Sequence, residues 1–216
     1  AEDTKLRRTV ALKFLPAAMA LDPQAKKRFL REAQAAAILD HPNICPVYEV
    51  EEAEGEMFMA MAFVEGRSLK ERIAEGPLPL IEALGIAAQM ADGLRSAHEK
   101  GVVHRDVKPA NIMLGAEGQV RITDFGLASL EGSVDLTRPQ TVLGTPAYMS
   151  PEQFRGERTD ARTDVWSFGV TLFETVTGRR PFAAERAADV RDEILNGVPP
   201  APSSIRAEVP PGLDEV

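Results

Sequence analysis

The chain has 216 residues, of which 44% are hydrophobic and 27% charged, a composition typical of a soluble globular protein. This composition excludes a disordered chain, a collagen-like repeat and a fibrous heptad protein. The 33 acidic and 25 basic residues give a net charge of −8, which argues against non-specific nucleic-acid binding because such binding needs a basic face to displace counterions.

The first part of the chain predicts strands and one helix. An apolar run at residues 9–15 is rich in strand-forming residues. Asp22 and Pro23 predict the N-cap and the first turn of a helix, and apolar residues then recur at helical spacing as far as Ala37. Two further strands are expected at 47–50 and 57–64.

The remainder of the chain predicts mostly helices. Ser68 and Glu71 match a capping box at the start of a short helix. A long helical pattern follows at 79–100, and short strands and loops then precede a second apolar helix at about 163–177. The proline-rich segment 198–212 is predicted to be a loop or a linker.

This order of elements predicts an α+β protein with a small mixed lobe and a larger, mainly helical lobe. We place the boundary near Glu65 and Gly66, which divides the chain into residues 1–65 and 66–216. The single cysteine, Cys45, excludes an intrachain disulfide and favours a reducing, cytoplasmic setting. No stretch approaches the roughly 18 uninterrupted apolar residues that a membrane helix needs, so no membrane segment is expected in this chain.

Four motifs occur in a specific order along the chain. They read VALK at 10–13, HRDVKPAN at 104–111, DFG at 124–126 and GTPAYMSPE at 144–152. Each is a weak signal alone, but on the combination the sequence resembles the protein kinase family, and within it the bacterial serine/threonine kinases of eukaryotic type. The resemblance spans essentially the whole chain. It implies a two-lobed fold whose small lobe has antiparallel strands and one helix.

The resemblance implies ATP and Mg²⁺ as cofactors and identifies residues for handling phosphate. By the family pattern, Lys13 holds the α- and β-phosphates and Glu32 in the first helix pairs with Lys13. Asp106 accepts the proton of the substrate hydroxyl. Asn111 and Asp124 hold the metal, because carboxylate and amide oxygens suit a hard cation.

The same resemblance implies a serine or threonine substrate and an apolar adenine pocket. Lys108 matches a lysine that contacts the γ-phosphate, and Thr145 matches a threonine that forms a hydrogen bond near Asp106. Both favour hydroxyl groups of serine or threonine in a protein substrate. The pocket residues are Ala11 as roof, Met113 as floor, Met61 as gatekeeper, and the hinge backbone from Ala62 to Val64.

The family pattern also implies regulation and internal support. Arg105 would bind a phosphate on the activation segment through charge-assisted hydrogen bonds, with Thr141 and then Thr137 as candidate phosphosites. The alternative is that both are ordinary loop threonines. His104 is expected to pack under Phe125 and not to act as a catalytic acid or base.

Asp164 is expected to hold the backbone of the catalytic loop.

The sequence departs from the family pattern at both ends. No glycine precedes Gly55, so we expect residues 1–65 to be a partial small lobe without the first strand and the glycine-rich loop. Residues 66–216 are expected to lack the final helices of the large lobe. The arginine that normally pairs with Glu152 is missing too, which predicts an unpaired, partly buried carboxylate.

Two interpretations follow from these departures. The chain is either a piece of an active serine/threonine kinase, or a degenerate kinase-like scaffold that binds a partner without turnover. Retention of all five phosphate-handling residues favours the first. For the first, we expect a protein substrate, autophosphorylation within a homodimer, and a cytoplasmic location, as a free domain or as part of a longer membrane-anchored protein.

Overall fold

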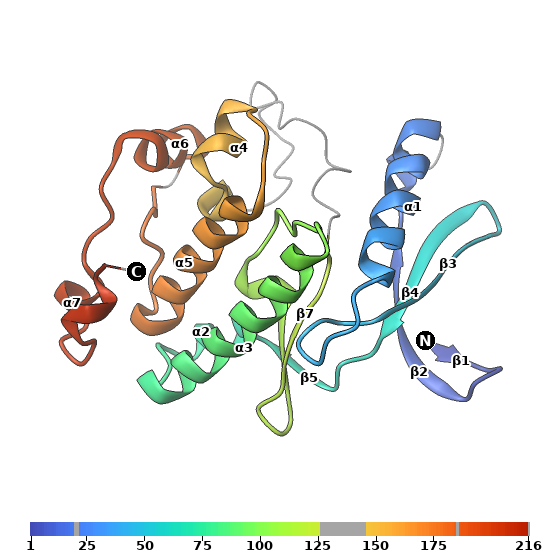
Figure 1. Ribbon diagram of the computed structural model, residues 1–216, viewed down its shortest axis with the longest axis horizontal. Coiled ribbons are helices and arrows are strands. Elements are labelled where there is room, and N and C mark those ends of the chain that lie inside the picture. Colours follow the sequence, from blue (N-terminus) through green and yellow to red (C-terminus); the bar gives the residue numbers. More distant parts are fainter. Residues whose placement is uncertain (20–21, 126–145, 185, 216) are drawn as a thin grey trace.

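The computed structural model describes residues 1–19, 22–125, 146–184 and 186–215. Within these ranges the chain forms a small lobe dominated by one sheet and a larger lobe dominated by helices (Figure 1). The predicted α+β class and the two-lobed arrangement are therefore confirmed.

The small lobe contains one antiparallel sheet in the order β1-β2-β4-β3. The predicted strands are present, with small differences at their ends. The third strand runs three residues further than expected, and its hairpin partner ends two residues earlier. The bounds are β1 (Glu2–Asp3), β2 (Arg8–Phe14), β3 (Val47–Ala53) and β4 (Glu56–Ala62).

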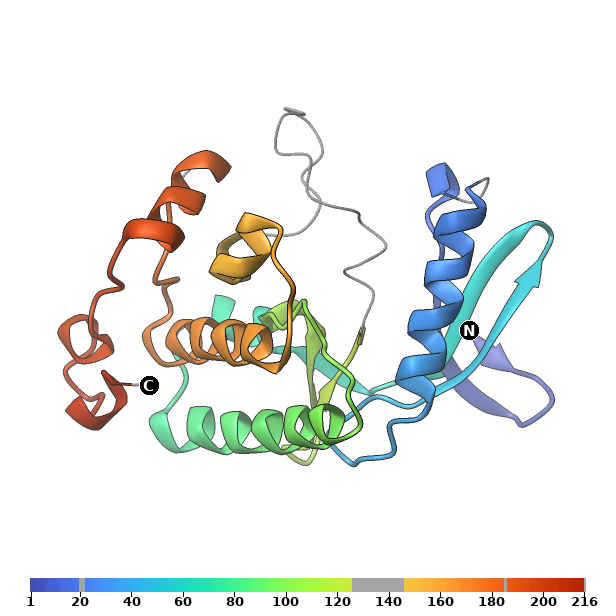
Figure 2. The same cartoon turned by 45° about the horizontal axis from the view of Figure 1, so that its top comes forward.

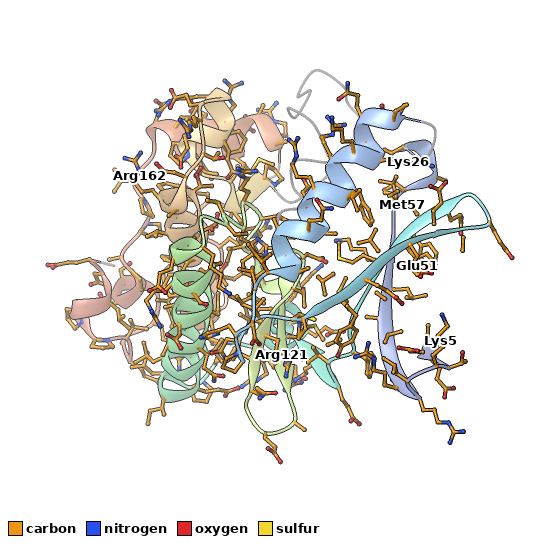
Figure 3. The ribbon with its side chains drawn as sticks, turned by 45° about the vertical axis from the view of Figure 1, so that its right-hand side comes forward. Lys5, Lys26, Glu51, Met57, Arg121 and Arg162 are labelled. Atoms are coloured by element: carbon orange, nitrogen blue, oxygen red, sulfur yellow. The ribbon has the colours of Figure 1, made fainter. Side chains whose placement is uncertain are left out.

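The helix of the small lobe, α1 (Pro23–Ala37), begins and packs largely as its sequence predicts. The Asp22 side chain accepts a hydrogen bond from the backbone N–H of Gln24 at 2.8 Å, and proline occupies the first helical position. Phe29 is fully buried against the sheet, which contributes about 2–3 kcal/mol. Met57, on β4, packs against the cluster that contains Phe29 (Figure 3). Ala37, the last of the apolar residues at helical spacing, is the last residue of the helix and is exposed.

The large lobe begins with a short strand and a capped helix. The Ser68 hydroxyl and the Glu71 carboxylate form the predicted capping box. A three-stranded sheet, in the order β5-β6-β7, lies beside the helices. The bounds are β5 (Gly66–Ser68), α2 (Leu69–Ala74), α3 (Leu80–Glu99), β6 (Ile112–Gly115), β7 (Val120–Ile122), α4 (Pro151–Arg155), α5 (Ala161–Thr177), α6 (Ala187–Asn196) and α7 (Pro202–Ile205).

Helices α3 and α5 lie side by side and form the centre of the large lobe (Figures 1 and 2). The main core joins the inner face of α3 to the β6–β7 hairpin, with Met90, Ile112 and Ile122 almost completely buried. Val107, between α3 and β6, is also fully buried in this core. The buried Val107 side chain therefore anchors its loop to the main core of the large lobe.

The proline-rich segment at 198–212 is not a loop or linker, so that prediction is wrong. It contains α7 and a 3₁₀ turn at Pro211–Leu213, and Val209 is buried in the main core. Arg206 donates hydrogen bonds to the carbonyls of Leu78 at 2.6 Å and Val176 at 2.9 Å. Proline is compatible with a helix at its first turn, because its missing N–H needs no partner there.

The connection between α1 and β3 joins the two lobes. The Asn43 side chain donates hydrogen bonds to Gln89 on α3 at 3.0 Å and to the carbonyl of Val120 at 2.9 Å. The backbone N–H of Cys45 donates to the carbonyl of Ile122 at 2.9 Å. These contacts place the small-lobe sheet next to the end of β7.

Candidate active site

The loop between α3 and β6 is built around His104, which is fully buried. Its Nδ1 accepts the backbone N–H of Asp106 at 3.1 Å, and its Nε2 lies 2.8 Å from the carbonyl of Thr123. Because a carbonyl can only accept, the proton is on Nε2 and the ring is neutral. The ring lies edge-on to Phe125, with centroids 4.6 Å apart. The predicted packing of His104 is therefore confirmed, and both of its nitrogens are already used.

Asp164 supports this loop from helix α5, as expected. Its fully buried carboxylate accepts the backbone N–H of His104 at 2.8 Å and that of Arg105 at 2.7 Å. The His98 ring contributes a third contact at 2.7 Å. Arg105 has φ +67°, a left-handed conformation that costs a residue with a side chain about 1–3 kcal/mol. The bond to Asp164 helps to hold that conformation.

Asp106, Lys108 and Asn111 lie together in the loop, Asn111 buried and the other two partly exposed. The Lys108 ammonium donates to both carboxylate oxygens of Asp106, at 2.7 and 2.9 Å. The amide nitrogen of Asn111 donates to the carboxylate at 3.0 Å and to the carbonyl of Asp106 at 2.8 Å. The Asp106 side chain remains about one-third exposed. A half-open carboxylate beside a cation is a group that can orient a hydroxyl and accept its proton.

Asp124 and Lys13 complete the constellation from the two lobes. The Lys13 ammonium, on β2, lies 2.8 Å from the Asp124 carboxylate. Thr123, the residue before Asp124, donates its backbone N–H and its hydroxyl to the carbonyl of Asn111, at 2.9 and 3.1 Å. Asp124 is thereby tied to the loop that carries Asp106. Glu32 is buried on α1, and its pairing with Lys13 stays a prediction.

The residues predicted to surround adenine come from two places. Those of the small lobe are in or against one apolar cluster, whereas Met113 lies on β6 in the other sheet, in register with Ser68. Met61 also lines a small cavity together with Asp124 and Phe125. The small-lobe members of this group are Ala11, Met61, Ala62 and Val64.

The backbone of Ala62 is already engaged within the fold. Its N–H donates to the carbonyl of Pro46 at 3.0 Å, and its carbonyl accepts the thiol of Cys45 at 3.3 Å. Burial raises the pKa of the Cys45 thiol to about 11, which keeps the proton that this bond needs. Cys45 is therefore a small buried residue of the core.

Of the candidate regulatory residues, the structure describes Arg105. Thr137, Thr141 and Thr145 lie outside the described residues. Arg105, their expected partner, is half-buried, and its Nε has no hydrogen-bond partner among the residues that the structure describes. The phosphosite assignments stay predictions.

Glu152 differs from the expectation of an unpaired carboxylate. The hydroxyl of Thr163, in the first turn of α5, donates to Glu152 at 2.6 Å. Burial opposes ionisation, but this hydrogen bond and others outweigh it and lower the pKa of Glu152. A neighbouring hydroxyl thus satisfies the carboxylate, and the expectation is wrong.

The side chains of Gln153 and Tyr148 form hydrogen bonds with residues distant in sequence that the sequence does not predict. The Gln153 amide donates to the carbonyl of Arg105 at 2.8 Å and accepts the N–H of Ser150 at 2.9 Å. The Tyr148 hydroxyl donates to Glu174 on α5 at 2.5 Å. The pattern from Ser150 to Gln153 is a capping-box signature, so the sequence carried a signal for the cap but not for the link to Arg105.

A family model described as protein kinase domain matches residues 1–208. The chain belongs to the protein kinase family. The kinase domain is 40% identical over 217 residues to the serine/threonine-protein kinase PrkC of Bacillus subtilis, covering 100% of this chain and 34% of that protein. It is 40% identical over 222 residues to the serine/threonine-protein kinase PknB of Mycobacterium leprae, covering 100% and 36%. It thus spans about a third of these relatives' length.

Solved structures agree with this assignment. The crystal structure of the Mycobacterium tuberculosis PknI kinase domain superimposes with a TM-score of 0.71 at 32% identity, covering 92% of this chain and 71% of that chain. The kinase domain therefore has the two-lobed protein kinase fold. Proteins of this family use ATP, typically with Mg²⁺. Among the described helices, none is both long and apolar enough to cross a membrane.

Proposed function

We propose that this chain is the catalytic domain of a serine/threonine protein kinase that transfers the γ-phosphate of ATP to a hydroxyl of a protein substrate. The observation that carries the proposal is the hydrogen-bonded group of Asp106, Lys108 and Asn111, with all four bonds at 3.0 Å or less. Thr123 connects this group to Asp124, which pairs with Lys13.

The proposed chemistry is positioning and charge neutralisation. Asp106 orients the substrate hydroxyl and accepts its proton, while the Lys108 ammonium offsets the charge that develops beside it. The Asn111 amide nitrogen is committed to Asp106, which leaves its oxygen for a cation. Asn111 and Asp124 would hold Mg²⁺ through hard oxygen ligands. Bound Mg²⁺ and ATP supply the phosphoryl group and neutralise its oxygens.

ATP binding is proposed to use both lobes. Lys13 contacts the phosphates, and Glu32 supports Lys13 from α1. The apolar cluster around Met61 supports an adenine site above Met113. We keep the boundary at residues 65 and 66, because the sheet of the small lobe ends before it and β5 begins at it.

Substrate choice and regulation follow from the same site. Lys108 and Thr145 favour serine or threonine as the acceptor. A phosphate on Thr141 or Thr137 would bind Arg105 through charge-assisted hydrogen bonds. Autophosphorylation in a homodimer is the simplest source of that phosphate, and a cytoplasmic location would supply the ATP.

The test uses the 216-residue chain with and without ATP and Mg²⁺. Binding to the folded state raises the apparent melting temperature by mass action, and label from γ-³²P-ATP should appear on serine or threonine of a basic protein. Label on tyrosine would contradict the acceptor assignment. A cooperative transition with neither shift nor transfer would favour the scaffold interpretation.

A further inference from the structure

The amide side chain of Gln153 joins helix α4 to a loop 48 residues away in sequence. Its oxygen accepts the backbone N–H of Ser150 at 2.9 Å, and its nitrogen donates to the carbonyl of Arg105 at 2.8 Å. A backbone N–H can only donate and a carbonyl can only accept, so the two partners determine the orientation of the amide. One side chain therefore performs two separate tasks.

The carbonyl that Gln153 holds belongs to the peptide group that leads into Asp106. The N–H of the same peptide group donates to His104 Nδ1 at 3.1 Å. The peptide is thus held at its oxygen from α4 and at its nitrogen from within the loop. The N–H of Arg105 itself is held by Asp164 from α5 at 2.7 Å.

This restraint matters because Arg105 has a left-handed backbone, with φ +67°. A residue with a side chain stays in that region only where its surroundings hold it. Rotation of the peptide after Arg105 would also turn the backbone of Asp106 and move its carboxylate away from Lys108 and Asn111. The bond from Gln153 opposes that rotation.

We propose that Gln153 is a positioning residue for Asp106. It makes the orientation of the catalytic carboxylate depend on the placement of α4, the helix that directly follows the 3₁₀ turn at Pro146–Tyr148. The inference rests on the proposed kinase function, in which Asp106 accepts the proton of the substrate.

The substitution Gln153→Glu separates the two tasks of the side chain. A glutamate still accepts the N–H of Ser150, as Glu71 does for Ser68 at the start of α2. It has no N–H for Arg105 and directs an oxygen at a carbonyl oxygen instead. We expect kcat to fall about tenfold or more, equivalent to about 1.4 kcal/mol, with KM for ATP close to that of the unaltered chain and with a cooperative unfolding transition.

The second readout is hydrogen–deuterium exchange of the backbone amides at residues 104–107. These amides should exchange faster in Gln153→Glu, because the loop to which they belong has lost one hydrogen bond that restrains it. The matched control is Glu71→Gln, which changes acid to amide in the capping box of α2. Within the described part of the chain, the hydrogen bonds of Glu71 in this box go to Ser68. This control should leave kcat and the exchange of residues 104–107 unchanged.

The proposal is overturned if Gln153→Glu keeps kcat within about twofold and leaves the exchange of residues 104–107 unchanged. If that variant loses its cooperative unfolding transition, Gln153→Met replaces it and removes both the donor to Arg105 and the acceptor for Ser150. Glu71→Met, which removes the corresponding acceptor in the capping box of α2, is then its control. The same two outcomes then decide. Hydrogen–deuterium exchange can be measured without catalytic turnover. If the unaltered chain has no kinase activity, the proposed function is contradicted, and the exchange result alone decides whether Gln153 restrains the loop.

Discussion

The Lys13 ammonium lies 2.8 Å from the Asp124 carboxylate, so a charge from the small lobe neutralises a charge from the large lobe. Both side chains remain partly exposed, at 37% and 26%. Exposed pairs of this kind contribute only about 0–1 kcal/mol to stability. The pair is therefore better understood as part of a binding site than as a support of the fold.

Replacement of Lys13 tests this view. Lys13→Met should leave the melting temperature of the free chain nearly unchanged, because the pair contributes little to folding. It should remove most of the stabilisation by ATP and Mg²⁺, because the phosphates lose their cation. Thermal unfolding with and without the nucleotide measures both effects, with Lys5→Met on the exposed β1–β2 turn as control. An undiminished nucleotide shift would contradict the role of Lys13.

The carboxylate of Asp106 is the group on which phosphoryl transfer should depend. Asp106→Asn cannot accept the proton of the hydroxyl, so we expect transfer to fall by about 10²–10⁴, the usual contribution of a general base. Nucleotide binding should remain nearly intact. Steady-state kinetics and thermal shifts measure the two separately. Asp160→Asn, at the exposed N-cap of α5, is the control, and equal kinetic losses in the two variants would rule out a specific role.

Thr171 carries a buried hydroxyl without a hydrogen-bond partner among the described residues. Thr171→Val removes this desolvated group at nearly constant volume, so the free energy of unfolding should rise by about 1 kcal/mol. Thr175, one turn later, donates its hydroxyl to the carbonyl of Thr171 at 2.7 Å. Thr175→Val should instead lower stability in denaturant titrations. Equal losses for both variants would show that the Thr171 hydroxyl is satisfied.

The pair of Tyr148 and Glu174 makes stability depend on pH. Burial raises the pKa of Glu174 above its ordinary value of about 4.3. Between the ordinary and the raised pKa, the folded chain binds a proton that the unfolded chain has lost, so this group favours folding at low pH and less as pH rises. Burial and the neighbouring Glu174 carboxylate also raise the pKa of Tyr148, which therefore keeps its proton.

Glu174→Gln removes the titrating group and keeps an acceptor for the Tyr148 hydroxyl. Its unfolding free energy relative to the unaltered chain should increase as pH rises from 4 to 7. Denaturant titrations across this range measure the difference. A difference that is constant, or that shrinks with pH, would contradict the assignment.

Much of the site could be read from the chain because its chemistry needs particular residue types at short spacings. Asp106, Lys108 and Asn111 lie within six residues, and the structure brings them into direct contact. The capped helices were likewise predictable, since the caps at Asp22 and Ser68 use local hydrogen bonds.

Other features depend on residues that are distant in sequence. The proline-rich tail looks like a linker because its helix is short and begins with proline, yet Arg206 binds the carbonyls of Leu78 and Val176 and holds it on the large lobe. In the sequence Glu152 has no obvious partner, because Thr163, which donates a hydrogen bond to it, is uncharged and does not stand out as a partner for a carboxylate.

The sequence by itself determined the fold class and the family and predicted the reactive groups, because periodicity, caps and clustered motifs are local properties of the chain. The tertiary structure decided how those groups are held. The Arg105–Asp106 peptide is restrained by Gln153 and His104, and Arg105 by Asp164. A hydrogen bond depends on an alignment within tenths of an ångström between segments that only packing brings together.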